Sequence, residues 1–219
     1  CFMSKPFMGV SANGCHTNVS LWKGGELKST PIGNNPLPGM DQVFTHISGG
    51  ENMFMPDPKI DAVKPGPVGL NSIAGLLKHL PALTCLGSPT VNSYRRLWDT
   101  GFWAPVYADW GYQNRTCSVR VSAPGRVEYR SVDSSHNPYL MGAGILKAFE
   151  DGLDNKMDPG EPEKKNIYDA MKEGKEVDKL PLTLGEAIQR LDSDDVIKSA
   201  LPEDMLRVFM HYKNDEWEK

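Results

Sequence analysis

The chain has 219 residues, of which 39% are hydrophobic and 24% charged, a composition typical of a globular protein with a sizeable core. Its formal net charge of -4, without a polybasic run, argues against non-specific binding of nucleic acid. No apolar run approaches the roughly 20 residues that a transmembrane helix needs, so we expect neither a nucleic-acid nor a membrane partner.

Cysteine usage favours a reducing location. The four cysteines lie at positions 1, 15, 85 and 117, and none belongs to a C-x-x-C pair, which argues against zinc ribbons and thioredoxin-type chemistry. Four cysteines in a chain of this length do not form a disulfide scaffold, so the simplest interpretation is a cytoplasmic protein. The chain opens on Cys1 rather than Met, and we expect an upstream part to precede it.

The first predicted element is a strand over residues 15–22. Side chains alternate between the two faces of a strand, so His16, Asn18 and Ser20 share one face. The stretch 28–39 is rich in Pro, Gly and Asn and predicts a loop.

A helix and three strands are predicted next. Residues 67–80 carry apolar side chains at helical spacing, and His79 near the end of this helix is expected to be a surface or capping histidine. The segments 106–115, 117–123 and 126–133 predict strands joined by short turns.

The C-terminal part predicts helices. Asn137 is a suitable N-cap for a helix over 139–153, and a polar loop over 157–166 follows. Amphipathic patterns predict two further helices over 183–193 and 202–217. Because strands come first and helices later, we expect an α+β domain.

The stretch "GRVEYR" at 125–130 places one acid between two bases. In a strand, Arg126, Glu128 and Arg130 lie on one face. One interpretation is a solvated face whose neighbouring charges compensate each other. The other is a site that handles a metal and anions together.

Arginines are dense around this stretch. They are Arg95, Arg96, Arg115, Arg120, Arg126 and Arg130. Guanidiniums bind phosphate and carboxylate groups bidentately and stay charged. A carboxylate among them, that of Glu128, is ionised at neutral pH and suits a metal ion, to which His16 could add an imidazole. The residues alone therefore indicate a phosphate-handling metal site.

Six motifs occur in order along the chain. They are "NGCHTNVSLW", "PTVNSYRRL", "APVYADWGYQNRT", "GRVEYRSVD", "NPYLMGAGILKAFEDGLDNKMDPGEP" and "NIYD". From about residue 3 to the C-terminus, the chain resembles the C-terminal half of the catalytic domain of the glutamine synthetase family. The resemblance implies an antiparallel sheet with flanking helices. It also implies that residues 1–219 are the C-terminal part of that domain, with the N-terminal β-grasp domain and the first half of the catalytic domain outside this chain.

The resemblance implies an activity. The family uses ATP to phosphorylate the γ-carboxylate of L-glutamate, and an amine then attacks the γ-glutamyl phosphate. Magnesium or manganese ions bridge the phosphates, ATP is a co-substrate, and the subunits form ring-based homo-oligomers, here expected to be dodecamers. Upstream glutamates would hold a second metal, so the 219 residues alone are expected to be inactive.

Residue roles follow by resemblance only. His16 and Glu128 match metal ligands. Arg96 and Arg130 match the residues that grip the carboxylates of glutamate. Of the two interpretations of residues 125–130, the resemblance favours the second, in which Glu128 holds a metal while the flanking arginines neutralise anions.

The nucleotide side is matched by a second set of residues. Arg115 and Arg120 match the pair that stabilises the transferred phosphoryl group, with Arg115 in a catalytic role. The remaining ATP-binding positions are Asn18, Ser20 and Arg126.

One residue differs from the family pattern in the flap that lies ahead of "APVYADWGYQNRT". Trp103 stands where ammonia-using members carry a glutamate that shields the intermediate and helps to deprotonate ammonium. An alkylamine gains about 0.8 kcal/mol per buried methyl or methylene group from added apolar surface. We therefore expect methylamine as the amine, as in the γ-glutamylmethylamide branch. Ammonia is the alternative, with Asp99 taking over the proton, and ordinary core packing of Trp103 is the plain structural interpretation.

Other features leave alternatives open. Ser11 and Ala12 replace an Asn-Gly pair that contacts glutamate in some bacterial members. Tyr168 matches a position that is adenylylated in some bacterial enzymes, although a buried or capping role is expected. A catalytically inactive structural member is the rival from another functional class, and the retained His16, Glu128 and arginines argue against it.

Overall fold

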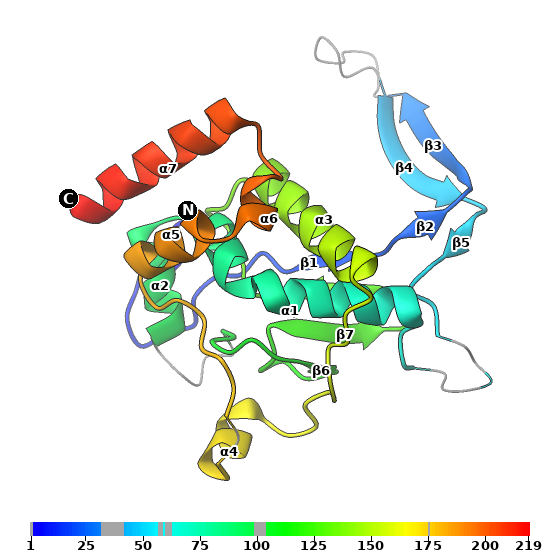
Figure 1. Cartoon of the computed structure of the whole chain (residues 1–219), viewed down its shortest axis with the longest axis horizontal. Helices are drawn as coiled ribbons and strands as arrows, with labels where there is room; N and C mark the ends of the chain where they lie inside the picture. The colour runs from blue at the N-terminus through cyan, green and yellow to red at the C-terminus, as the bar shows by residue number, and fades with distance from the viewer. Residues whose placement is uncertain (1, 32–41, 57–58, 60–62, 99–103, 175) are drawn as a thin grey trace.

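The structure is a computed structural model that describes residues 2–219, except 32–41, 57–58, 60–62, 99–103 and 175 (Figure 1). The strands are β1 (Thr17–Val19), β2 (Trp22–Lys23), β3 (Glu26–Pro31), β4 (Gln42–Ser48), β5 (Glu51–Asn52), β6 (Trp110–Tyr112), β7 (Val119–Ala123) and β8 (Arg126–Tyr129). The helices are α1 (Pro67–Gly87), α2 (Val91–Trp98), α3 (Pro138–Asp154), α4 (Ile167–Lys172), α5 (Leu184–Asp192), α6 (Asp195–Lys198) and α7 (Glu203–Glu218). The expected α+β class is confirmed.

A four-stranded sheet, in the order β1-β8-β7-β6, forms the centre of the fold. Its pairs are antiparallel except β6 and β7, which are parallel, so the expected antiparallel sheet is in fact mixed. The reason is the wide loop between these strands. Nδ2 of Asn114 in this loop donates to the Lys165 carbonyl at 2.7 Å, and the chain returns to the start of β6, where the Val119 N–H donates to the Asp109 carbonyl at 3.1 Å.

Two short ribbons extend from the N-terminal part. β2 pairs with β5, and β3 pairs with β4, which projects away from the body in Figure 1. The predicted loop over 28–39 is therefore wrong for its first residues, which belong to β3. The rest of that prediction, from residue 32, lies outside the described residues.

α1 covers one face of the sheet (Figure 1). Apolar side chains of β7 and β8, among them Val121 and Val127, join the leucines of α1 in one buried core. The helix continues to Gly87 rather than ending at residue 80. It runs through Pro81 because the flanking Leu80 and Ala82 are both buried in this core, and that packing outweighs the hydrogen bond which a proline removes.

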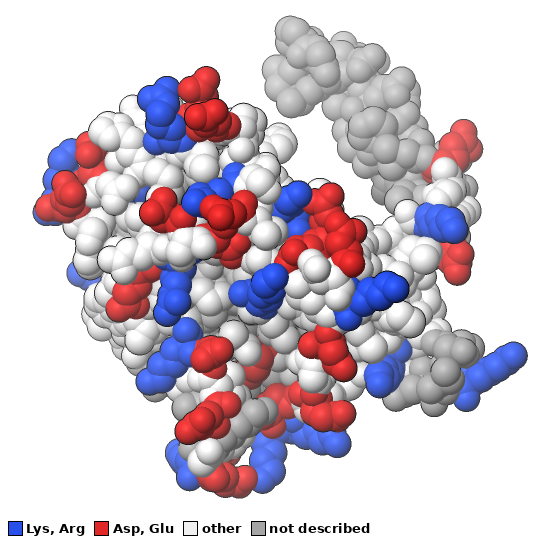
Figure 2. Space-filling view, in the orientation of Figure 1, with Lys and Arg blue, Asp and Glu red and all other residues white. Residues whose placement is uncertain are grey.

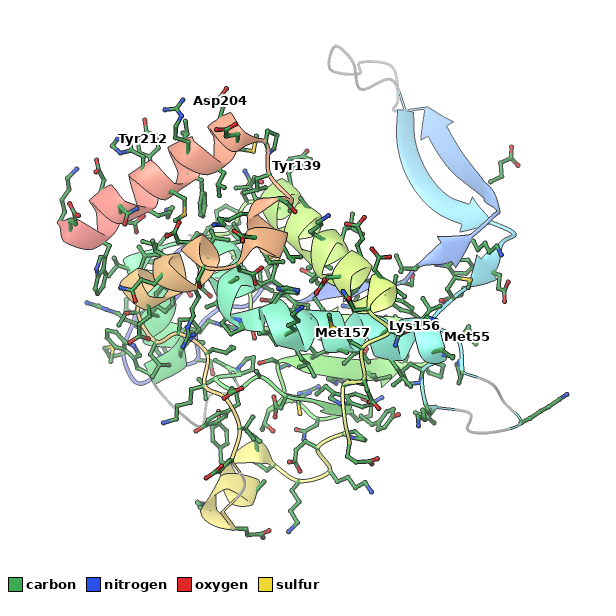
Figure 3. The ribbon with its side chains drawn as sticks, in the orientation of Figure 1. Met55, Tyr139, Lys156, Met157, Asp204 and Tyr212 are labelled. Carbon is green, nitrogen blue, oxygen red and sulfur yellow. The ribbon has the colours of Figure 1, made fainter. Side chains whose placement is uncertain are left out.

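α3 begins and ends with recognisable caps. The side chain of Asn137 accepts hydrogen bonds from the first turn, as predicted. At the other end, Lys156 adopts φ 49°, and the Met157 N–H reaches back to the Gly152 carbonyl at 3.0 Å, which is a Schellman arrangement. Figure 3 shows Lys156 and Met157 where the chain leaves α3 beside α1, and Nδ2 of Asn71 fastens the Met157 carbonyl at 2.7 Å. The predicted loop over 157–166 follows.

The predicted C-terminal helices are present as α5 and α7. On the face seen in Figure 2, acidic and basic side chains are mixed, without an extended basic surface. None of the helices in the described part of the chain combines the length and the apolar character that crossing a bilayer requires.

His79 corrects one prediction. It is 3% exposed rather than a surface residue. Its Nδ1 lies 2.6 Å from a carboxylate oxygen of Asp194, and its Nε2 lies 2.8 Å from one of Asp151. Burial alone would lower the pKa of His79, but hydrogen bonds to Asp194 and Asp151 raise it above the ordinary value. A protonated His79 thus joins α1 to α3 and to the N-cap of α6.

Candidate active site

Strand register assembles the charged residues on the sheet face opposite α1. Glu128 on β8 lies directly across from Asn18 on β1 and from Arg120 on β7. Since neighbours of these positions point into the core, the three side chains share the other face. With their alternate neighbours they form what we call the charged face, which consists of His16, Asn18, Arg120, Arg126, Glu128 and Arg130.

The Glu128 carboxylate is the centre of this face. Its Oε2 accepts a hydrogen bond from Nη1 of Arg120 at 2.9 Å. Its Oε1 lies 3.5 Å from Nη1 of Arg130 and 3.3 Å from Nδ1 of His16. The side chain is only 9% exposed, so these contacts replace most of its hydration. The structure thus brings His16, Glu128, Arg120 and Arg130 together.

His16 is neutral at physiological pH. Burial, followed by the positive charge of Arg130, lowers its pKa to about 4, although Glu128 acts in the opposite direction. Its Nδ1 therefore accepts from Nη1 of Arg130, 3.2 Å away, and does not form an ion pair with Glu128. The lone pairs of the imidazole nitrogen and of Oε1 of Glu128 thus both face Nη1 of Arg130, which lies 3.2 Å from the first and 3.5 Å from the second.

This pair fits part of a metal site. Neutral imidazole and carboxylate are both ligands for divalent cations, and carboxylate in particular suits magnesium and manganese. Among the described residues, no group of three or more His, Cys, Asp and Glu side chains is arranged to hold a metal. His16 and Glu128 could therefore supply two ligands, and further ligands would have to come from elsewhere in the complete protein.

The side chains of Arg96 and Arg130 are buried close to His16 and Glu128, and each residue is 3% exposed. Nε of Arg96 donates to the Asn13 carbonyl at 2.9 Å, and its Nη2 donates to the Arg130 carbonyl at 3.0 Å. Nη2 of Arg130 donates to the Arg115 carbonyl at 3.0 Å. Burial lowers the pKa of Arg96 to about 10 and also lowers that of Arg130, yet both remain cationic at neutral pH.

Arg96 retains donor capacity towards a ligand. Its Nη1 is buried and has no hydrogen-bond partner within the described part of the chain. A buried guanidinium whose hydrogen bonds go to neutral carbonyls keeps its charge available for a carboxylate. Asn13, which the sequence analysis did not single out, supports this arrangement, because its carbonyl accepts from Arg96 and its Oδ1 accepts from the Ser134 N–H at 3.1 Å.

The residues that match nucleotide-binding positions of the family are exposed or half-buried. Nε of Arg126 donates to Oγ of Ser122 at 3.2 Å. Oγ of Ser20 accepts from Nε1 of Trp22 at 2.9 Å. The side chains of Asn18 and Arg115 are exposed, and the Arg115 backbone is tied to Arg130.

Gln113 contacts Arg120 of the charged face, and the sequence analysis did not single it out. Its Oε1 accepts from Nη2 of Arg120 at 2.8 Å. Its position in "GYQNRT", two residues before Arg115, was the available signal. Asp99 and Trp103, the two flap residues, lie outside the described residues. The hydroxyl of the half-buried Tyr168 donates to the Ala104 carbonyl at 3.4 Å.

Comparison with known proteins identifies relatives along the whole chain. The glutamine synthetases of Pyrococcus furiosus and Pyrococcus abyssi are 38% and 40% identical to it, each over 99% of the chain. The glutamine synthetase of Thermotoga maritima is 36% identical over 100% of the chain. The chain spans 44% of the length of the two Pyrococcus proteins.

Solved structures agree. GmaS without ligand superposes with a TM-score of 0.78 at 32% identity, and a GmaS/ADP complex with a TM-score of 0.80 at 32% identity. Each match covers 100% of this chain, and 44% and 45% of those chains. The family described as glutamine synthetase, catalytic domain, matches residues 42–219. The resemblance read from the six motifs is confirmed: this chain belongs to the glutamine synthetase catalytic-domain family.

Proposed function

We propose that the complete protein is an ATP-dependent ligase that joins a small amine to the γ-carboxylate of L-glutamate through γ-glutamyl phosphate. The observation that carries the proposal is the charged face, on which a neutral His16 and the Glu128 side chain converge among arginines. Phosphoryl transfer depends mainly on positioning and on the stabilisation of negative charge, and this face offers both.

His16 and Glu128 would hold a magnesium or manganese ion. Such an ion, when bound, neutralises charge on the phosphates of ATP. The chain's own cations extend this effect. Arg120 and Arg115 would stabilise the transferred phosphoryl group, while Asn18, Ser20 and Arg126 would orient the nucleotide.

Glutamate would bind on the inner side. Arg96 and Arg130 are buried and fixed by backbone carbonyls, so they would grip the carboxylates with little loss of side-chain freedom. The arrangement orients the γ-carboxylate towards the phosphate side of the charged face. The γ-carboxylate would attack the γ-phosphate of ATP and displace ADP. The amine would then attack the acyl phosphate, which releases inorganic phosphate, and would lose a proton to give the amide.

Methylamine is the amine that we propose. Trp103 in place of a flap glutamate gives apolar surface for a methyl group, and an aromatic face attracts an alkylammonium. The similarity to GmaS, a γ-glutamylmethylamide synthetase, supports this choice. Ammonia is the second candidate, because the curated relatives at 36–40% identity are named glutamine synthetase, and Asp99 could accept its proton.

The organisation of the complete protein belongs to the same proposal. We infer that residues 1–219 are the C-terminal part of the catalytic domain, and that the upstream part supplies the β-grasp domain and further metal ligands. The protein would assemble into a ring-based homo-oligomer, a dodecamer, in the cytoplasm.

The test is a steady-state assay of the complete protein with ATP and glutamate, using methylamine, ammonia and ethylamine in turn. We expect all to react, with methylamine preferred. One methyl group supports discrimination of about 10- to 200-fold. Trp103→Glu should lower the efficiency ratio of methylamine over ammonia by about 10-fold, with little change in the KM for glutamate. An unmutated enzyme that prefers ammonia overturns the methylamine proposal, and absence of any amide product overturns the ligase.

A further inference from the structure

Gln113 follows β6 and contacts the charged face directly. Its Oε1 accepts from Nη2 of Arg120 at 2.8 Å, and its Nε2 donates to the Ser122 carbonyl at 2.5 Å. A guanidinium can only donate and a carbonyl can only accept. The two partners therefore fix the orientation of the amide, with its oxygen towards Arg120.

The backbone at Gln113 is also unusual. Its φ is 50°, in the left-handed region that side chains other than Gly, Asn and Asp rarely adopt. Its N–H donates to the Val121 carbonyl at 3.1 Å, which holds this conformation beside β7. Such conformations persist only where the surroundings hold them, and they concentrate at functional sites.

Register explains why the contact comes from this position. Gly111 on β6 lies directly beside Arg120. A Cβ atom at Gly111 would lie 2.6 Å from the Glu163 carbonyl oxygen, so that position cannot carry a side chain that reaches Arg120. Gln113, two residues further on and just beyond the strand, is the residue whose side chain reaches Arg120.

The chemistry of the contact suits an anion site. At its other end, Arg120 donates through Nη1 to Oε2 of Glu128 at 2.9 Å. A neutral amide restrains a guanidinium without offsetting its charge, whereas a second carboxylate would offset it. Held by Gln113, Arg120 keeps its positive charge for phosphate oxygens.

We propose that Gln113 is a positioning residue, which aims Arg120 at the point where Glu128 and the nucleotide phosphates meet. The inference rests on the proposed ligase function. It differs from a purely structural role, in which Gln113 would only close the turn after β6.

Three substitutions in the complete protein separate these roles. Gln113→Leu removes both side-chain hydrogen bonds, and we expect kcat and the affinity for ADP to fall by about 10-fold each. Gln113→Glu keeps the shape but adds a carboxylate beside Arg120, and the fall in ADP affinity should be at least as large. Gln113→Gly relieves the backbone conformation but lacks the amide, so its kcat should match that of the Leu variant.

The measurements are ADP binding by titration calorimetry, kcat, the KM for glutamate and the melting temperature. Gln189→Leu, at an exposed glutamine on α5, is the matched control and should leave all four unchanged. In the Gln113 variants, the KM for glutamate should change by less than about 2-fold, because Arg120 acts on the phosphate side.

Each outcome decides between the alternatives. Unchanged ADP affinity and kcat in the Leu and Glu variants overturn the inference and leave the ligase intact. Recovery of kcat in the Gly variant, or equal losses in melting temperature and in all kinetic constants, assigns Gln113 to the turn alone and also overturns it. A wild-type protein that neither binds ADP nor forms amide overturns the proposed function and this inference with it.

Discussion

Glu128 and Arg130 of the charged face and the contact between α1 and α3 are all buried, but different physical demands shape the two regions. Between the helices, glycines bring the backbones together: a Cβ atom at Gly75 would lie 2.0 Å from the Ala148 carbonyl oxygen, and one at Gly152 would lie 2.2 Å from that of Asn71. On the charged face, Arg120 and Arg130 contact one carboxylate, Glu128, and the buried Arg96 donates to the Arg130 carbonyl.

Packing explains why glycines lie at the first contact, because close helices gain dispersion and exclude water. It does not explain the second. Guanidiniums that are 3% exposed repel one another, and the burial that lowers the pKa of Arg96 and Arg130 costs stability. A protein keeps such a cluster when function requires it. Mutations on the charged face should therefore reduce activity above all, whereas mutations between the helices should reduce stability above all.

The largest expected effect is at Glu128. Glu128→Gln keeps the shape but removes the charge that binds a hard cation, and magnesium-dependent turnover of the complete enzyme should fall by at least about 100-fold. The substitution also leaves the guanidiniums of Arg120 and Arg130 without their counter-charge, so the melting temperature should fall, and turnover is measured where a melting curve shows the variant to be folded. Glu150→Gln on the exposed surface of α3 is the control. Near-normal turnover at ordinary magnesium concentrations would remove Glu128 from the site.

Arg115→Lys tests whether Arg115 stabilises the transferred phosphoryl group. The substitution keeps the charge but loses the fork that holds a phosphoryl group, and kcat should fall by about 10- to 100-fold. The KM for glutamate should rise less, because the interaction strengthens in the transition state. Arg207→Lys on α7 is the exposed control. Weakened glutamate binding with normal kcat would instead make Arg115 a substrate grip.

Gly152→Ala tests the packed region. A methyl group there meets the Asn71 carbonyl oxygen at 2.2 Å, and we expect a loss of about 1–3 kcal/mol in the free energy of unfolding. Gly142→Ala on the same helix is the matched control, since a Cβ there has nothing within 4 Å, and it should stabilise α3 by up to about 1 kcal/mol. Chemical denaturation of both variants compares them directly, and equal effects would contradict the close contact.

The smallest effect concerns pH. A histidine whose pKa is raised on folding contributes stability that is full below about pH 6.5 and is lost as pH rises through the higher folded pKa. Asp151 and Asp194 have lowered pKa values, so their contribution is lost only as pH falls through those values. Unfolding measurements from pH 6 to 9 should show declining stability, a slope that His79→Gln flattens and His211→Gln on the exposed side of α7 does not. An unchanged slope in His79→Gln would contradict a contribution to stability from the hydrogen bonds of His79 to Asp151 and Asp194.

Much of the fold followed from local patterns. Asn137 capped α3 as expected, and helical spacing predicted α5 and α7. Other features depend on tertiary contacts. The parallel pairing of β6 and β7 requires the loop held by Asn114, and the burial of His79 requires two carboxylates that are distant in sequence.

The proximity of His16, Glu128 and Arg130 was predictable, because alternation in strands and the family motifs coincide there. Gln113 was missed because its contact with Arg120 depends on a positive φ and on strand register, and its position in "GYQNRT" was the only signal in the sequence. Trp103 and Asp99 lie outside the described residues, so their roles stay predictions.

The most direct test of the central claim is metal binding on the charged face. Mn²⁺ is titrated into the complete protein and into its Glu128→Gln variant, each with ADP, and bound ion is followed by electron paramagnetic resonance. The account predicts that the affinity of one Mn²⁺ site falls by at least about 10-fold in the variant. Even the loss of a residue that only hydrogen-bonds to a metal ligand typically lowers metal affinity by about this factor. Identical titration curves for the two proteins would contradict it.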